Sequence, residues 1–444
     1  MTRSRHAHDT FTRPAPRPAP PEAAPSPTAP PGPSDGPSDG PTWAVDSPAL
    51  GTGLTARPCG DPLRPAEPPP AAGTPVALAL SGGGFRATLS ALGFVRLLAD
   101  AGLLRHLRYA SSVSGGSIAN ACLATAWPAL RERNFTPRAV DELVTGPVVD
   151  HVSSHSLKRS LLRDIWRTLG PTTRTDLLAR RLDDWFLGET ELADLDPQVR
   201  WIVNAANMTT GVRFGFERDV YGDYSIGLAR TAGTGLRLSR AVSASAAVPG
   251  LLPPVVLDGS PFPCAAHDPA LLDGGTYDNT GLEAIDGDRY RHTFLCALNA
   301  GGLLRPGMYG RVPVIRDLAR ANSLLYRQST TLRTRATIER FRRAAALGPV
   351  GELPDGARRG ILVQLSTDFP DEDPLPHRWR AAFPEHRTHD GRDLALVPTV
   401  FDRISPSLCR ALIHRGWWLG GAALAAYHPG LLPSDLTALD PPEL

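Results

Sequence analysis

The clearest structural signal in the chain is Val76-Ala-Leu-Ala-Leu-Ser-Gly-Gly-Gly84, a short apolar run that ends in three glycines. An apolar run of this length in front of a glycine turn predicts a buried strand. Residues 85–101 then carry leucine and valine at a spacing of three to four residues. This spacing predicts an amphipathic helix, which Gly102 ends.

The same order of elements follows a second time. Residues 108–113 predict a strand, Ser114-Gly-Gly116 a turn, and residues 117–130 a helix. A repeated strand, turn and helix is typical of a mostly parallel sheet that helices cover, so the predicted fold class is α/β. Further strands are expected at 201–204, 271–272, 294–298 and 361–365.

The 444 residues divide into parts of different composition. Nineteen of the 45 prolines lie in the first 70 residues, where large apolar side chains are few. Such a segment cannot bury enough apolar surface to offset the entropy of ordering. We expect a disordered proline-rich segment over residues 1–73, one catalytic domain with a helical C-terminal part over 74–430, and a tail over 431–444.

The charge and cysteine content exclude several classes of protein. The chain has 47 basic and 45 acidic residues, a net charge of +2, without the basic excess of a nucleic-acid binder. Five widely spaced cysteines without a CxxC pair exclude zinc ribbons, and four of them lie in apolar surroundings that suit buried free thiols. The first 20 residues lack the apolar stretch of a secretory signal, and no run of about 18 apolar residues predicts a membrane span. We therefore expect a cytoplasmic protein.

Ser114 is the first candidate for catalysis. It follows an apolar strand and precedes two glycines and a helix. A sharp turn from strand to helix exposes a serine hydroxyl, and the helix N-terminus adds unpaired N–H groups and a partial positive charge. The pattern departs from GxSxG at its first position, where Ser112 stands. An ordinary serine-glycine turn or helix cap explains this segment equally well.

The glycine loop Ser81-Gly-Gly-Gly-Phe-Arg86 is the second candidate. Its glycines let the backbone approach a ligand closely, and their N–H groups can converge on an anion. A dinucleotide loop competes with this interpretation, because Ala87 completes GxGxxA. The next strand, however, offers no carboxylate for a ribose, so an oxyanion hole fits better. Arg86 would hold the loop or contact a substrate phosphate.

Asp273 is the third candidate. The segment Leu271-Leu-Asp-Gly-Gly275 places its carboxylate at the end of an apolar strand. There it would point into the same crevice as Ser114, beyond the strand ends. An Asx turn is the simpler explanation, and Asp258 is a rival in a proline-rich turn.

Four segments in this order together resemble the patatin-like phospholipases: residues 81–87, 112–116, 241–254 and 273–275. The form SGGGFRA of the glycine loop is similar to that of the cytosolic phospholipase A2 branch. The resemblance implies a three-layer α/β/α fold and a Ser-Asp dyad that acts on acyl esters of lipids.

The resemblance also implies roles for single residues. Ser114 would be the nucleophile and Asp273 its partner. Gly83, Gly84 and Gly115 would furnish the oxyanion hole, and Arg86 would be a substrate-binding residue. No metal and no cofactor are expected. The partners would be a lipid substrate and, transiently, a membrane surface, with no nucleic acid.

The predicted function is that of a serine lipid acyl hydrolase of the phospholipase A or lysophospholipase type. An α/β-hydrolase-type esterase, thioesterase or acyltransferase is an alternative, with His377, His389 or His414 completing a Ser-His-Asp triad. A non-catalytic patatin-like module that binds lipid or protein is another. His151 and His155 lack the glutamate of HExxH, so no zinc site is predicted.

Residues 315–345 predict a long arginine-rich helix whose charges form a solvated face. Its apolar side would consist of Leu318, Leu324, Leu325, Leu332 and Ile338. This helix, Leu251-Leu252 and Trp417-Trp418 are the apolar or basic segments available for membrane contact. Each is more typical of a core or of a solvated face, so no docking site is assigned.

Overall fold

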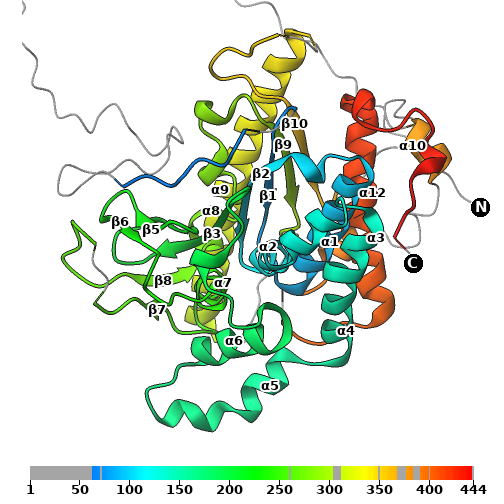
Figure 1. Ribbon diagram of the computed structural model, residues 1–444. Coiled ribbons are helices and arrows are strands. Elements are labelled where there is room, and N and C mark those ends of the chain that lie inside the picture. The colour runs from blue at the N-terminus through cyan, green and yellow to red at the C-terminus, as the bar shows by residue number, and fades with distance from the viewer. Residues whose placement is uncertain are drawn as a thin grey trace, which may run out of the picture. The chain divides into compact units, whose positions relative to one another are not determined.

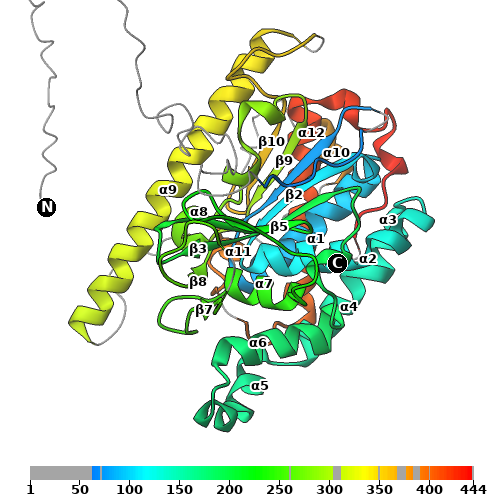
Figure 2. The same cartoon turned by 60° about the vertical axis from the view of Figure 1, so that its left-hand side comes forward.

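The computed structural model describes residues 63–70, 73–259, 262–303, 312–348, 351–367, 377–383, 391–399 and 401–442. A ten-stranded mixed sheet with helices on both of its faces forms the centre (Figures 1 and 2). The expected α/β class and the three-layer α/β/α arrangement are therefore confirmed.

The strand order of the sheet is β10-β9-β1-β2-β3-β4-β5-β6, and β8 pairs with both β3 and β7. The strands from β10 to β3 run parallel, whereas β4 to β8 pair in antiparallel fashion. Their bounds are β1 Val76–Leu80, β2 Leu107–Val113, β3 Arg200–Asn207, β4 Val212–Phe216, β5 Val220–Asp223, β6 Gly227–Arg230, β7 Val255–Val256, β8 Ala270–Asp273, β9 Phe294–Asn299 and β10 Gly360–Gln364. All the strands that the sequence predicted are present, but β4 to β7 were not predicted.

β1 shows how the layers are built. Val76, Leu78 and Leu80 pack into the main core with α1, α2 and α12. Ala77 and Ala79 point to the opposite face, where residues 282–290 and Phe341 of α9 cover them. Because successive side chains of a strand alternate between faces, a strand covered on both sides must be apolar throughout.

The helices that form the two outer layers differ in length. The long ones are α1 Gly84–Asp100, α2 Gly115–Glu132, α9 Pro313–Ala346 and α12 Pro406–Tyr427. The shorter ones are α3 Pro137–Val140, α4 Gly146–Ser154, α5 Leu157–Arg163, α6 Arg174–Leu182, α7 Leu238–Ser245, α8 Gly275–Asp278, α10 His377–Ala382 and α11 Gly391–Ala395. Within the described ranges, no helix combines the length and the hydropathy needed to cross a bilayer.

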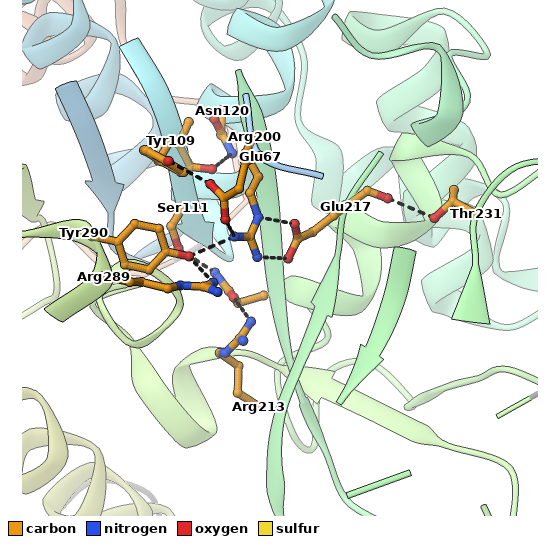
Figure 3. A network of polar contacts seen from close by, with 12 residues as sticks. Glu67, Tyr109, Ser111, Asn120, Arg200, Arg213, Glu217, Thr231, Arg289 and Tyr290 are labelled. Carbon is orange, nitrogen blue, oxygen red and sulfur yellow. Dashed lines mark hydrogen bonds and ion pairs between the residues drawn. The ribbon is translucent and has the colours of Figure 1, made fainter. Parts of the chain in front are cut away.

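The described part of the proline-rich segment contacts the sheet. Glu67 accepts a hydrogen bond from the hydroxyl of Tyr109 at 2.8 Å and lies 3.7 Å from the guanidinium of Arg200 (Figure 3). Residues 1–62 lie outside the described residues, so the division of the chain at residues 73 and 430 stays a prediction.

Three of the cysteines are free and buried, namely Cys122, Cys296 and Cys409. Burial raises the pKa of Cys122 to about 12, so this thiol stays protonated at neutral pH. Cys264 is disulfide-bonded, and the expectation of free thiols is therefore wrong for this residue.

A buried ion pair joins Arg200 of β3 to Glu217, the residue directly after β4, at the edge of the parallel part of the sheet. The guanidinium of Arg200 donates two hydrogen bonds to Glu217, at 2.5 and 2.9 Å, and one to the Tyr290 hydroxyl at 2.8 Å (Figure 3). Burial alone lowers the pKa of Arg200, but the Glu217 carboxylate outweighs this effect and keeps the pKa above its ordinary value. Arg200 therefore keeps its positive charge in the folded protein.

We expect Glu217→Ala to lower the free energy of unfolding by about 3–5 kcal/mol, because it leaves the Arg200 charge buried without its partner. Denaturant unfolding of the full chain measures this loss. Glu67→Gln serves as the control: Glu67 is 55% exposed, so its pairing with Arg200 contributes less than about 1 kcal/mol. Equal losses in the two variants would contradict this account of the buried pair.

Candidate active site

Ser114 lies at the turn between β2 and α2, as the sequence predicted. Its φ is 51° and its ψ is −119°, a backbone conformation with positive φ that residues other than glycine rarely adopt. Such backbone strain costs about 1–3 kcal/mol and persists only where the surrounding structure enforces it. Gly115 begins α2, so the Ser114 side chain lies at the N-terminus of an 18-residue helix.

The turn is enforced by direct backbone contact with the preceding glycine loop. A Cβ at Gly115 would lie 2.0 Å from the carbonyl oxygen of Gly84, and one at Gly116 would lie 2.6 Å from that of Leu80. Neither position has room for a side chain. The two glycines after Ser114 therefore let the turns that follow β1 and β2 pack against each other.

A chain of buried hydroxyl groups lies behind the nucleophile candidate. The N–H of Ser114 donates to Oγ of Ser245 at 2.9 Å, and Ser245 in turn donates to the carbonyl oxygen of Asn204 at 2.6 Å. Oγ of Ser117 lies 3.0 Å from Oγ of Ser245. These contacts join α2, α7 and β3 at the point where Ser114 must be held.

Ser112, the departure from GxSxG, belongs to the same chain of hydroxyl groups. Its Oγ accepts from Nδ2 of Asn120 at 2.9 Å and from Oγ of Ser117 at 3.1 Å, and it donates to the carbonyl oxygen of Ile202 at 3.2 Å. A buried serine whose hydroxyl is fully hydrogen-bonded carries little penalty. The departure is therefore accommodated without disturbing the turn.

The register of the sheet places Asp273 beside Ser114. Val113 of β2 pairs with Asn204 of β3, and the next residue of β3, Ala205, pairs with Asp273 of β8. The carboxylate therefore lies across β3 from the turn that carries Ser114. It accepts a hydrogen bond from the Ser114 side chain and another, at 2.7 Å, from the N–H of Gly275.

Asp273 is 7% exposed, and burial raises its pKa from 3.8 to about 6. The hydrogen bonds from Ser114 and Gly275 act in the opposite direction and lower the pKa. The carboxylate is thus a stronger base than an aspartate in water, yet it remains mostly ionised at neutral pH.

The structure brings the predicted oxyanion glycines to the same place. Gly84 begins α1 and Gly115 begins α2, so their N–H groups belong to first helical turns, which lack intrahelical acceptors. Gly83 and Gly84 have φ values of 148° and 61°, which only glycine adopts readily. Gly83 lines a cavity together with Ser114 and Asp273.

This cavity has a volume of about 600 Å³. Val248, Pro249 and Leu303 give it apolar walls, while Asn279 and Asn299 contribute amide groups. Both polar and apolar surfaces are thus within reach of Ser114, which suits a substrate that has an ester group and an apolar portion.

α9 forms one wall of the cavity, and the expectation that its polar face is only solvated is wrong. One side of the helix supplies Ser323, Tyr326, Arg327, Thr330, Thr331, Thr334, Arg335 and Ile338. These residues recur every three to four positions and therefore share one helical face. The spacing was present in the sequence, but an alternation of threonine and arginine gives no sign of which face a helix buries.

Tyr326 and Asn279 are site residues to which the sequence gave no role. The phenol of Tyr326 lines the cavity. Burial is the main cause that raises its pKa; Arg86 acts in the opposite direction, and the nearby Asp273 carboxylate raises the pKa further. Asn279 is 2% exposed, and its backbone carbonyl accepts the N–H of Gly82 at 3.0 Å. Both side chains thus lie close to the Ser114–Asp273 pair.

Arg86 is 1% exposed and is not among the residues that line the cavity. Its guanidinium donates to the carbonyl oxygens of Ala300, at 3.0 Å, and Val397, and to Oγ1 of Thr399 at 3.1 Å. Burial lowers its pKa to about 10. The arrangement favours the role of holding the glycine loop over that of binding substrate.

The histidines considered for a triad lie elsewhere. His377 is exposed on α10, and His414 is buried within α12 beside Trp417, with ring centroids 5.9 Å apart. Neither lines the cavity, and His389 lies outside the described residues. Among the residues that the structure describes, no group of three His, Cys, Asp or Glu side chains could hold a metal ion.

The family model of the patatin-like phospholipases matches residues 78–286. This part of the chain, which includes Ser114, Asp273 and the glycine loop, therefore belongs to the patatin-like phospholipase family. The match supports a lipid acyl hydrolase. No curated protein matches the chain by sequence.

Solved structures with low sequence identity are similar to this chain. Human GIVD cytosolic phospholipase A2 is 14% identical, with a TM-score of 0.47; the match covers 82% of this chain and 60% of the human chain. VipD from Legionella pneumophila is 16% identical, with a TM-score of 0.30, and the match covers 73% of this chain and 67% of that one. This chain thus spans 60% of the human enzyme, and the family assignment rests on the family model.

We expect Ser245→Ala to lower the free energy of unfolding by about 1–3 kcal/mol, because the buried N–H of Ser114 loses its acceptor. Ser243→Ala is a matched control on the same helix, since the buried Ser243 hydroxyl has no hydrogen-bond partner among the described residues. Denaturant unfolding compares the two variants. If Ser243→Ala were the more destabilised, the hydroxyl chain would not be what holds the turn.

Proposed function

We propose that the protein is a serine lipid acyl hydrolase of the phospholipase A or lysophospholipase type, with Ser114 as nucleophile and Asp273 as base. One observation carries the proposal: a buried carboxylate with a raised pKa accepts a hydrogen bond from a serine at a strained strand-to-helix turn. Serine, carboxylate and glycine loop meet at one cavity, which is the arrangement that acyl transfer requires.

In the acylation step, Asp273 accepts the hydroxyl proton of Ser114 while Oγ attacks the acyl carbon. The carbonyl oxygen gains the negative charge, and the N–H groups of Gly83, Gly84 and Gly115 would stabilise it. Each such donor contributes about 3–4 kcal/mol to the transition state in enzymes of this kind. The proton on Asp273 then passes to the departing alcohol, and the acyl group remains on Ser114.

In the deacylation step, Asp273 accepts a proton from water, whose oxygen attacks the acyl carbon. Collapse of the second tetrahedral intermediate breaks the bond to Oγ, which recovers its proton from Asp273, and the fatty acid leaves. Because one carboxylate serves both steps, no histidine is needed. No step uses a metal or a cofactor.

Membrane lipids are the substrate class that this proposal implies, and we place the enzyme in the cytoplasm with peripheral contact at the membrane. Residues 74–430 would form the catalytic domain. The family match and the mixed polar and apolar lining of the cavity support a lipid ester.

We expect a fluorophosphonate probe to label wild-type protein and not Ser114→Ala, because only an activated serine reacts with it. Labelling is read on a gel, and mass spectrometry of the labelled peptide identifies the residue. The buried Ser117→Ala, which leaves the nucleophile in place, should still be labelled. A folded wild-type protein that takes up no label would favour a binding module without catalysis.

As the pH is lowered, we expect kcat/KM for a soluble short-chain ester to fall to half of its plateau value at a pH of about 6. Below this pH it should fall tenfold for each further pH unit. Asp273 acts as a base only when ionised, and its carboxylate is ionised above this pKa. Asp273→Asn should be inactive across the whole range. If His377→Ala or His414→Ala abolished activity as fully, a triad would replace the dyad.

A further inference from the structure

α9 carries apolar side chains on the side that faces away from the cavity. Val314 is 69% exposed, Leu325 65% and Leu332 57%. At 100° per residue these three positions lie within about 20° of one another around the helix axis, opposite the row that lines the cavity. We call these three residues the outer stripe of α9.

The outer stripe has no partner among the described residues. Figure 2 shows α9 with α8 and the sheet on one side and no other described element on the other. Leu324, 52% exposed, extends the apolar surface from the stripe toward the cavity side of the helix. Exposed leucines on one helical face are typical of a surface that contacts something apolar.

The charge of α9 indicates what that surface contacts. Residues 313–346 contain eight arginines and two acidic residues, a net charge of +6, whereas the whole chain has a net charge of +2. Arg333 and Arg340 are used internally, in ion pairs with Glu283 and with Asp286 and Asp288. Arg327, Arg335, Arg342 and Arg343 are exposed, and the last two lie 3.9 and 3.6 Å from Glu339.

A leucine stripe flanked by arginines is the pattern of a helix that lies in a membrane surface. Anionic lipid headgroups would neutralise the exposed arginines, whereas pairing with α9 of a second copy would bring two sets of exposed arginines together. Charge complementarity therefore favours lipid over a second copy of the chain.

The position of α9 at the cavity gives such docking a purpose. Arg327 and Arg335 both line the cavity; around the helix axis Arg335 lies about 60–80° from the outer stripe, and Arg327 lies nearly opposite to it. Leu251 is 58% exposed, in a turn that its N–H closes onto the carbonyl oxygen of Val248, which lines the cavity. A bilayer at the outer stripe would lie about one helix diameter, roughly 10 Å, from the side of α9 that lines the cavity.

We propose that α9 is the membrane-docking element of this protein, with the outer stripe inserted among the lipids and its arginines on anionic headgroups. The inference rests on the proposed function, because a lipid acyl hydrolase must reach a substrate held in a bilayer. It goes beyond that function by naming the surface that makes the contact.

The test is sedimentation with vesicles of phosphatidylcholine, alone or in equimolar mixture with phosphatidylserine. All proteins are full-length and carry Ser114→Ala, so that binding is measured without hydrolysis. We expect binding to the anionic vesicles that weakens as salt is raised, and the double variant Leu325→Ser/Leu332→Ser to bind at least about tenfold more weakly.

Leu169→Ser is the matched control, because Leu169 is 92% exposed and lies on a different element. It should bind like the parent protein. With Ser114 intact, the double variant should hydrolyse a soluble short-chain ester at the wild-type rate, because neither leucine lines the cavity.

Two outcomes would overturn the proposal. Unchanged vesicle binding by the double variant would exclude the outer stripe as the docking surface. A wild-type dimer that the double variant converts to a monomer would assign the stripe to a second copy. Failure of Ser114 labelling would instead contradict the proposed function, and vesicle binding would still report on α9 independently.

Discussion

Backbone contact between the turns after β1 and β2 is the constraint on which the site depends. Leu80 of β1 and Ser112 of β2 are partners in adjacent parallel strands, so the turns that follow these two strands begin at the same level of the sheet. The glycines at 84, 115 and 116 allow the turns to touch, with an added Cβ at Gly115 only 2.0 Å from the oxygen of Gly84. Two helix N-termini therefore converge beside Ser114, and their positive ends favour negative charge there.

The same site reduces the stability of the fold at neutral pH. Asp273 has a folded pKa of about 6, above its unfolded value, so its contribution to stability is present below about pH 4 and is lost as the pH rises through 6. An ionised Asp273 at pH 7 therefore costs about 3 kcal/mol relative to a carboxylate in water. The strained φ of Ser114 adds to this cost. Both are maintained by surrounding structure that has no catalytic role, such as the hydroxyl chain through Ser245.

The sequence predicted the parallel part of the sheet and the residues that the structure brings together, because glycine turns after apolar strands leave a strong local signal. It did not predict β4 to β7, a region of short antiparallel strands in which Arg213 is buried on β4 and Glu217 is buried directly after it. Nor could it place Arg86, whose basic side chain looks like a ligand for phosphate until its three acceptors from distant segments are known. Such long-range polar contacts have no periodicity in the sequence.

α9 shows most clearly why composition and location have to be distinguished. The sequence predicts a solvated face for its arginines, yet Arg333 and Arg340 attach its C-terminal half to acidic residues of the segment 278–288. These ion pairs use much of the negative charge that would otherwise balance the helix within the body. The cationic excess is thereby left on the exposed arginines, next to the cavity. A chain that is nearly neutral as a whole thus concentrates positive charge on a wall of its candidate active site. The net charge of all 444 residues does not reveal this local excess.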